Sequence, residues 1–112
     1  MRELLAEVYK AIDEKKGEDI VSYEFTPLNP FIDYVVICSA QNLRQVHAIA
    51  NNIQDRMKEK KFSIKRKEGT KESRWILIDL DSVIVHVFYD EERNVYQLEK
   101  LYADLKQVDI SL

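Results

Sequence analysis

Hydrophobic residues follow two different periods along the chain, and these periods predict its helices and strands. Spacings of three and four residues, as at Leu5, Val8 and Ile12, indicate amphipathic helices, whereas alternation or a short apolar run indicates a strand. Both prolines fall in the segment TPLNPFI, which is therefore expected to be a loop. The predicted elements, in chain order, are a helix over 2–15, strands over 19–25 and 33–39, a helix over 42–61, a short edge strand within 62–69, strands over 74–80 and 83–89, and a helix over 95–105.

This order of elements predicts an α+β fold. A chain of 112 residues is one domain, here residues 1–112, and it is long enough to bury a core without a disulfide or a metal. Strands interrupted by helices favour a mixed five-stranded sheet with helices packed against it. If the strands on either side of the helix over 42–61 are parallel neighbours, their crossover should be right-handed.

The ends and the buried faces of the helices follow from the same pattern. Gly17 is expected to end the first helix, because glycine tolerates a positive φ. Asn42 is a good N-cap for the second helix, and Gln45 completes a capping-box pattern. The predicted apolar stripe of the second helix is Leu43, Val46, Ala50, Ile53 and Met57. That of the last helix is Leu98, Leu101, Tyr102 and Leu105.

The segment WILIDLDSVIVHVF, residues 75–88, predicts a β-hairpin with two dissimilar faces. With Asp81 and Ser82 as the central turn residues, alternation places only aliphatic side chains on one face, as a helix–sheet core requires. These are Ile76, Ile78, Leu80, Val83, Val85 and Val87. The other face is aromatic and sparsely charged, which is the composition of an interface centre. It holds Trp75, Leu77, Asp79, Ile84, His86 and Phe88.

Two other interpretations of this outer face stay open. In the first interpretation, a further helix covers the face, Asp79 caps that helix, and a backbone group forms the hydrogen bond that the His86 imidazole requires. In the second, the face around Trp75 is self-complementary and joins two copies of the chain in a homodimer.

Charge is distributed unevenly along the chain. The net charge is −3, yet residues 56–74 contain nine Lys and Arg against three Asp and Glu. This basic segment is either a solvated helix end, strand and loop, or a surface that approaches the phosphate groups of a nucleic acid. The candidate RNA contacts are Lys60, Lys61, Lys65, Arg66 and Lys67.

The sequence also bears on compartment. Cys38 is the only cysteine, so no disulfide forms within the chain, and its apolar surroundings indicate a buried thiol rather than a nucleophile. The longest apolar runs have the length of strands, so no membrane contact is expected. The first residues resemble neither a signal peptide nor a transit peptide. A cytoplasmic location is therefore predicted, or an equivalent organelle interior if a presequence has been lost.

The hairpin could also be catalytic, and the enzyme class that its residues suggest is a metal-dependent nucleotidyltransferase. Asp79 and Asp81 form an Asp-x-Asp pair at a strand end, and such pairs can hold two divalent cations. Against it, Asp81 falls in the turn, and two glycines in the whole chain make no phosphate loop. Ser82 and His86 fall on opposite faces, so they form no triad, and two histidines with one cysteine form no zinc set. We therefore expect no enzymatic activity, no catalytic residue, no metal and no cofactor.

Several segments together resemble the ribosomal silencing factor family, also called RsfS or Iojap-related proteins. The segments KGEDI, DYVVICS, RQVHAIA, WILIDLDSVIVHVF and RNVYQLEKLYAD occur in the family's order, and the resemblance covers residues 1–104. The matching positions include Gly17, Asp19, Asp33, Arg44, Glu68, Gly69, Trp75, Asp79, His86, Arg93, Tyr96, Leu98 and Glu99. Three pairs depart from the family's usual residues: Asp81-Ser82 replaces Gly-Asp, Leu101-Tyr102 replaces Leu-Trp, and Ser39-Ala40 replaces Thr-Gly.

The resemblance implies a regulatory, non-enzymatic protein. Members of the family bind the large ribosomal subunit through ribosomal protein fourteen, at the face that meets the small subunit. They thereby block subunit joining and repress translation when nutrients are short, or act in large-subunit biogenesis. The family's sheet is similar to that of nucleotidyltransferases but lacks their active site. The partner-binding residues predicted for this chain, from the outer face and tip of the hairpin, are Trp75, Leu77, Asp79, Asp81, His86 and Phe88.

Overall fold

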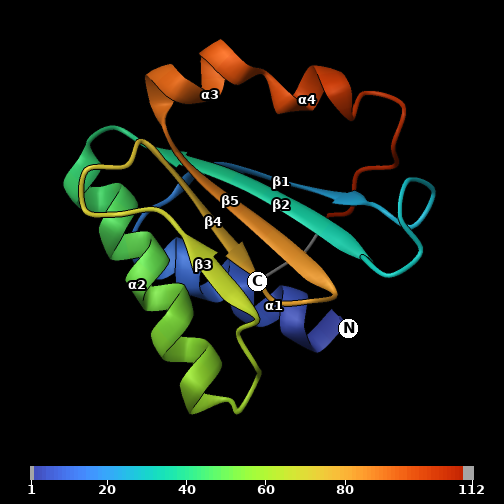
Figure 1. Ribbon diagram of the computed structural model, residues 1–112, viewed down its shortest axis with the longest axis horizontal. Helices are drawn as coiled ribbons and strands as arrows, with labels where there is room; N and C mark the ends of the chain where they lie inside the picture. Colours follow the sequence, from blue (N-terminus) through green and yellow to red (C-terminus); the bar gives the residue numbers. More distant parts are fainter. Residues whose placement is uncertain (1, 110–112) are drawn as a thin grey trace.

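The computed structural model describes residues 2–109, which form one mixed sheet with helices on both faces (Figure 1). The helices are α1 (Arg2–Glu14), α2 (Leu43–Glu59), α3 (Asp90–Tyr96) and α4 (Leu98–Leu101). The strands are β1 (Glu18–Glu24), β2 (Tyr34–Ala40), β3 (Arg66–Glu68), β4 (Trp75–Asp79) and β5 (Val83–Tyr89). The predicted α+β class with a five-stranded mixed sheet is therefore confirmed.

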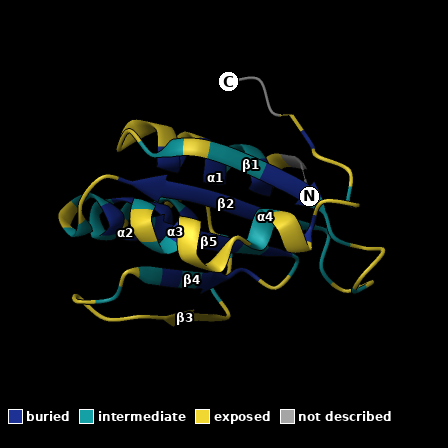
Figure 2. Cartoon of the chain, turned by 90° about the horizontal axis from the view of Figure 1, so that it is seen from above, coloured by how far each residue is buried: buried dark blue, intermediate teal, exposed yellow. Residues whose placement is uncertain are grey.

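The strands lie in the order β1-β2-β5-β4-β3, and β2 and β5 are the parallel pair. The other neighbours are antiparallel. The strands on either side of α2 are β2 and β3, which are not neighbours, so the condition set for a right-handed crossover is not met. The edge strand β3 is confirmed, and it is shorter than the segment 62–69 in which it was expected. All of its residues are exposed, including two cations that discourage pairing with another strand (Figure 2).

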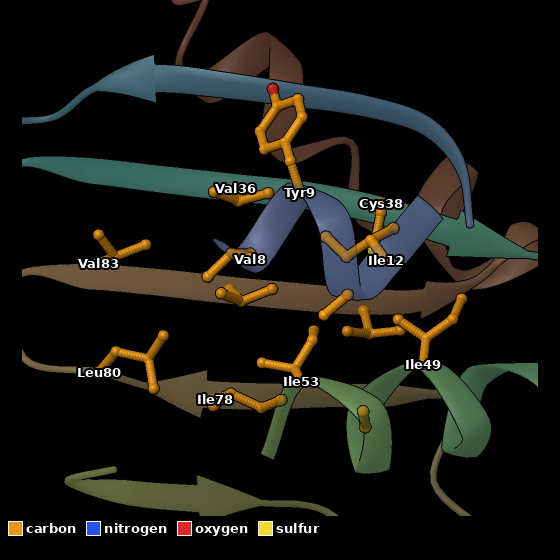
Figure 3. Packing of buried hydrophobic residues seen from close by; sticks show 14 of the residues in the cluster. Val8, Tyr9, Ile12, Val36, Cys38, Ile49, Ile53, Ile78, Leu80 and Val83 are labelled. Carbon is orange, nitrogen blue, oxygen red and sulfur yellow. The ribbon is translucent and has the colours of Figure 1, made fainter. Parts of the chain in front are cut away.

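Helices α1 and α2 cover one face of the sheet and enclose the larger core. Figure 3 shows Val8 and Ile12 of α1, and Ile49 and Ile53 of α2, among the buried side chains against this face. The six aliphatic residues predicted for the inner face of the hairpin are all buried there. In the stripe of α2, Ile49 is also buried and Leu43 only half-buried, because the stripe is centred one position away from the predicted one. Cys38 is fully buried, and this burial raises the pKa of its thiol to about 12.

Helix α1 ends just before Gly17, as expected, but the physical reason for glycine at this position is a different one. Lys16, with a φ of 59°, takes the left-handed conformation there, not Gly17. Gly17 is needed for space instead, because an added Cβ would lie 2.3 Å from Cγ2 of Ile12. At the start of α2, Asn42 accepts the predicted hydrogen bond from the Gln45 backbone at 2.8 Å. The Gln45 side chain does not complete the capping box, because it donates to the Lys16 carbonyl at 2.9 Å and ties the two helices together.

The turn of the hairpin places a non-glycine residue in the left-handed region. Asp81 has a φ of 74°, between Leu80 and Ser82, which are joined by a backbone hydrogen bond of 3.0 Å. The expected central turn residues are therefore confirmed. The Asp81 backbone nitrogen also donates a hydrogen bond of 2.8 Å to Oδ1 of Asp79, and this bond stabilises the turn.

We predict that Asp81→Gly stabilises the protein. The positive φ costs an L-residue free energy that glycine avoids, so the free energy of unfolding should rise by about 0.5–1 kcal/mol. The ion pair lost between Asp81 and Lys65, 3.6 Å long, is exposed and contributes little. Asp81→Ala is the matched control, because it removes the same carboxylate but keeps Cβ. Equal stability of the two variants in urea unfolding would contradict the prediction.

Candidate functional site

The outer face of the hairpin is organised around Trp75. The predicted cross-strand neighbours are confirmed: Trp75 lies opposite Phe88, Leu77 opposite His86, and Asp79 opposite Ile84. The Trp75 indole stacks on the Phe88 ring, with 4.8 Å between centroids and 28° between planes. Its Nε1 donates a hydrogen bond of 3.0 Å to Nδ1 of His86. Neighbouring strands thus fix the indole by both a ring contact and a directed hydrogen bond.

The protonation state of His86 is part of this arrangement. His86 is 7% exposed, and burial lowers the pKa of its imidazole from 6.5 to about 4. The imidazole is therefore neutral at pH 7, as it must be for Nδ1 to accept the Trp75 hydrogen bond. A partner for His86 from the backbone was one interpretation of the sequence. The structure gives it a side-chain partner instead, because Trp75 on β4 lies diagonally across from His86 on β5 and its indole reaches the imidazole.

Helices α3 and α4 cover part of this outer face (Figure 1). A second, smaller core lies beneath them, in which Tyr102 contacts Tyr23 with their rings 5.7 Å apart. The interpretation that helices cover the face is therefore correct in part. Asp79 does not cap either helix, since its carboxylate is used inside the hairpin turn.

The predicted single helix over 95–105 is wrong. The chain breaks at Gln97, which has a φ of 49°, and this break separates α3 from α4. Because the left-handed conformation at Gln97 interrupts the helical repeat, the predicted stripe does not stay on one face. Tyr102 is buried, but Leu101 is 71% exposed.

The break leaves an accessible aromatic and aliphatic surface beside the hairpin. Tyr96, at the end of α3, is 52% exposed and contacts Trp75 with 4.7 Å between ring centroids. Trp75 and Leu77 are half-buried and line a shallow cavity of about 300 Å³ together with Glu68 and Gly69. We call Trp75, Leu77 and Tyr96 the Trp75 surface.

The six predicted partner-binding residues differ in accessibility. Trp75 and Leu77 reach the surface, and Asp81 is exposed at the hairpin tip. Asp79, His86 and Phe88 are buried, at 8%, 7% and 1% exposure. His86 and Phe88 lie against Trp75, so they support the exposed residues rather than offer area of their own. Whether any of the six binds a partner stays a prediction.

Asp79 and Asp81 of the Asp-x-Asp pair line one cavity of about 410 Å³ at the hairpin tip, together with Lys65. Asp79 is buried with its Oδ2 3.7 Å from Nε of Arg66, whereas Asp81 points to solvent and pairs with Lys65. Among residues 2–109, the structure brings together no group of three or more His, Cys, Asp or Glu that could hold a metal ion. Each of the two carboxylates faces a cation of the protein itself, Arg66 beside Asp79 and Lys65 beside Asp81.

Two residues important for the site were not identified as such from the sequence. Tyr96 was not placed beside Trp75, because nothing in the pattern signalled the break at Gln97. Arg93 is 8% exposed and holds α3 onto the sheet: Nε donates to Oε1 of Glu99 at 2.8 Å and Nη1 to Oγ of Ser39 at 2.9 Å. A separation of six residues between Arg93 and Glu99 is not a helical pairing distance, so spacing gave no signal.

The basic residues singled out as RNA contacts are all exposed. Lys65 and Arg66 lie near the hairpin tip and face Asp81 and Asp79, respectively. Lys60 and Lys61 follow the end of α2. No helix in the described part of the chain has the length and apolar character needed to cross a membrane.

Comparison with known proteins gives a consistent result. A family model described as "Ribosomal silencing factor during starvation" matches residues 1–112. The ribosomal silencing factor RsfS of Bacillus subtilis is 41% identical over 100 residues, which cover 89% of this chain and 85% of that protein. The chloroplastic protein Iojap of Zea mays is 31% identical over 101 residues, covering 90% of this chain and 44% of that protein.

A solved structure has the same fold as this chain over nearly its whole length. The crystal structure of a Bacillus halodurans protein matches with a TM-score of 0.87 and 38% identity, covering 98% of this chain and 100% of that one. The chain therefore belongs to the ribosomal silencing factor family.

Proposed function

We propose that this protein binds the large ribosomal subunit through ribosomal protein fourteen, at the face that meets the small subunit. Bound there, it blocks association of the subunits and represses translation in the cytoplasm. Membership of the ribosomal silencing factor family supports a role at the ribosome. The observation that carries the finer proposal is the Trp75 surface, an accessible aromatic patch held rigidly by its neighbours.

The Trp75 surface has the chemistry of a binding anchor. Tryptophan and tyrosine supply large contact areas with few rotatable bonds, and they dominate the energetics of many interfaces. Because Trp75 is already fixed by Phe88 and His86, binding costs little further ordering of its side chain. The indole is thus prepared for contact before a partner arrives.

Charge around the surface favours a basic protein partner. Residues 75–112 contain eight Asp and Glu against three Lys and Arg. The first turn of α3, close to Tyr96 in the chain, holds Asp90, Glu91 and Glu92. An excess of acidic residues in this half of the chain attracts a cationic protein and speeds its association.

A subunit-joining experiment tests this proposal. Purified protein should co-sediment with isolated large subunits, not with small ones, and should reduce the fraction of joined ribosomes formed when both are mixed. Added ribosomal protein fourteen should compete for it. Binding to small subunits, or normal joining at saturating protein, would overturn the proposal. Self-association that saturates without ribosomes would favour the homodimer instead.

We also propose that the protein is not an enzyme. The proposed partner-binding residues act through contact, and the carboxylates of Asp79 and Asp81 face Arg66 and Lys65 of the protein itself. Calorimetry with magnesium and a nucleoside triphosphate should therefore show no saturable, metal-dependent heat. Such heat, lost in Asp81→Asn, would support a nucleotidyltransferase.

A further inference from the structure

A basic cleft lies between α2 and the connection from β3 to β4, and of the residues that line it only Lys67 is among the candidate RNA contacts predicted from the sequence. Its volume is about 450 Å³. One wall comes from α2, and the other from the end of β3 and the turn after it. The lining residues are Arg44, His47, Asn51, Lys67, Gly69, Thr70 and Lys71.

The sequence builds this cleft from two local patterns. Arg44, His47 and Asn51 are three and four residues apart, so they project from one side of α2. Opposite them, the chain turns at Gly69, which has a φ of 129° that side chains rarely adopt. Nζ of Lys67 donates to Oε1 of Gln54 at 3.2 Å and thereby links the two walls.

The electrostatics of the cleft favour an anion. Its lining contains three cations and no carboxylate. Within residues 2–109, neither Arg44 nor Lys71 has an ion pair, and the nearby carboxylate of Glu68 lies 3.8 Å from Nη2 of Arg66. Nε2 of His47 is shielded from solvent and has no hydrogen-bond partner, which leaves a polar atom unsatisfied. The cleft thus concentrates positive charge that the protein itself does not neutralise.

We propose that this cleft binds phosphate groups of an RNA chain. A nucleoside polyphosphate is usually held by a loop of glycine backbone N–H groups, and Gly69 is the only glycine here. Cations spread over two walls suit successive phosphates of a backbone better than one compact anion. Arginine can hold a phosphate through two parallel hydrogen bonds, and lysine adds a point charge.

The position of the cleft links it to the Trp75 surface. Gly69 lines both this cleft and the cavity beside Trp75 and Leu77. One docking event can therefore bring a protein to the Trp75 surface and an adjoining RNA segment to the cleft. This link rests on the proposed binding to the large subunit, but phosphate binding by the cleft does not.

The test compares two double variants of equal charge change. Arg44→Ala with Lys71→Ala removes two cations from the cleft, and Lys10→Ala with Lys106→Ala removes two exposed cations elsewhere. Binding of each to a labelled single-stranded RNA oligonucleotide is measured by anisotropy at several salt concentrations. The cleft variant should lose affinity about tenfold at low salt, and its log–log salt slope should fall by about one to two. The control should change neither quantity appreciably.

Competitors then identify the ligand. Neither inorganic phosphate nor a nucleoside triphosphate should displace the RNA at equal phosphate concentration, and polyglutamate should bind more weakly than RNA. Equal RNA binding by the two double variants would overturn the proposal, as would stronger binding of the triphosphate or of polyglutamate. Repeating the comparison with large subunits separates the two proposals. If RNA binding depends on the cleft while wild-type protein ignores large subunits, only the proposed function fails.

Discussion

Replacing Trp75 with alanine is expected to weaken binding to the large ribosomal subunit by about 2 kcal/mol or more, which is roughly thirtyfold in the dissociation constant. The substitution removes the largest side chain of the Trp75 surface and the one that Phe88, His86 and Tyr96 all contact. Because Trp75 is half-buried, some loss of folding stability should accompany the loss of affinity. Both must be measured, by co-sedimentation and by urea unfolding, under conditions in which the variant is folded.

Two further variants separate contact from folding. Tyr96→Ala removes an aromatic ring that is 52% exposed, so it should weaken binding with little effect on unfolding. Phe31→Ala is the comparison variant, because Phe31 is 84% exposed in the loop before β2 and lines the cavity at the hairpin tip rather than the Trp75 surface. If Phe31→Ala weakens binding while Trp75→Ala and Tyr96→Ala do not, the partner binds at another surface.

The hairpin shows how much a local pattern can establish. Its register, both faces and all three outer pairs agree with the structure. The reason is that a strand repeats every two residues, so one assumption about a two-residue turn fixes every neighbour. The alternation within the two strands, however, does not predict which other segments of the chain pack on the outer face.

Long-range partners account for the features that could not be predicted. Near the end of the described chain, Lys106 accepts from the Glu24 backbone at 2.9 Å, and Val108 donates to the Ser22 carbonyl at 2.8 Å. This segment covers the β1 edge, and no periodicity announces it. Arg93 likewise reaches Ser39 across 54 positions of sequence. Such contacts depend on the assembled sheet, so they are invisible to a window of neighbouring residues.

The same limit explains the outcome for the candidate site. Alternation correctly grouped Trp75 with His86 and Phe88, but it could not rank them by exposure. That ranking depends on α3 and α4, and their arrangement depends on the left-handed conformation at Gln97. Glutamine is not a residue that signals such a conformation, so the exposed position of Tyr96 was also out of reach.

Lowering the pH from 7 to 4.5 is expected to reduce the free energy of unfolding by about 2 kcal/mol through His86 alone. Burial lowers the folded-state pKa of this imidazole from 6.5 to about 4. Between these values the unfolded chain binds a proton that the folded protein excludes, so acid stabilises the unfolded state. The contribution of His86 is therefore complete above pH 6.5 and is lost progressively as the pH falls towards 4.

Other groups titrate in a different window. Hydrogen bonds from Arg56 hold the pKa values of Glu7 and Glu14 below their usual 4.5. Their contribution to stability is present above pH 4.5 and is lost only as the pH falls further. The interval from pH 6.5 to 4.5 consequently reports on His86 with little interference from this ion-pair cluster.

The measurement is urea unfolding followed by the fluorescence of Trp75, the only tryptophan in the chain. His86→Asn should flatten the pH dependence between 6.5 and 4.5, because an amide oxygen can accept the Trp75 hydrogen bond without binding a proton. Wild-type protein and His86→Asn are compared at the same series of pH values and urea concentrations. A wild-type slope that survives His86→Asn would show that His86 is not excluded from protonation by the fold. It would also remove the reason for treating the Trp75–His86 hydrogen bond as the support of the Trp75 surface.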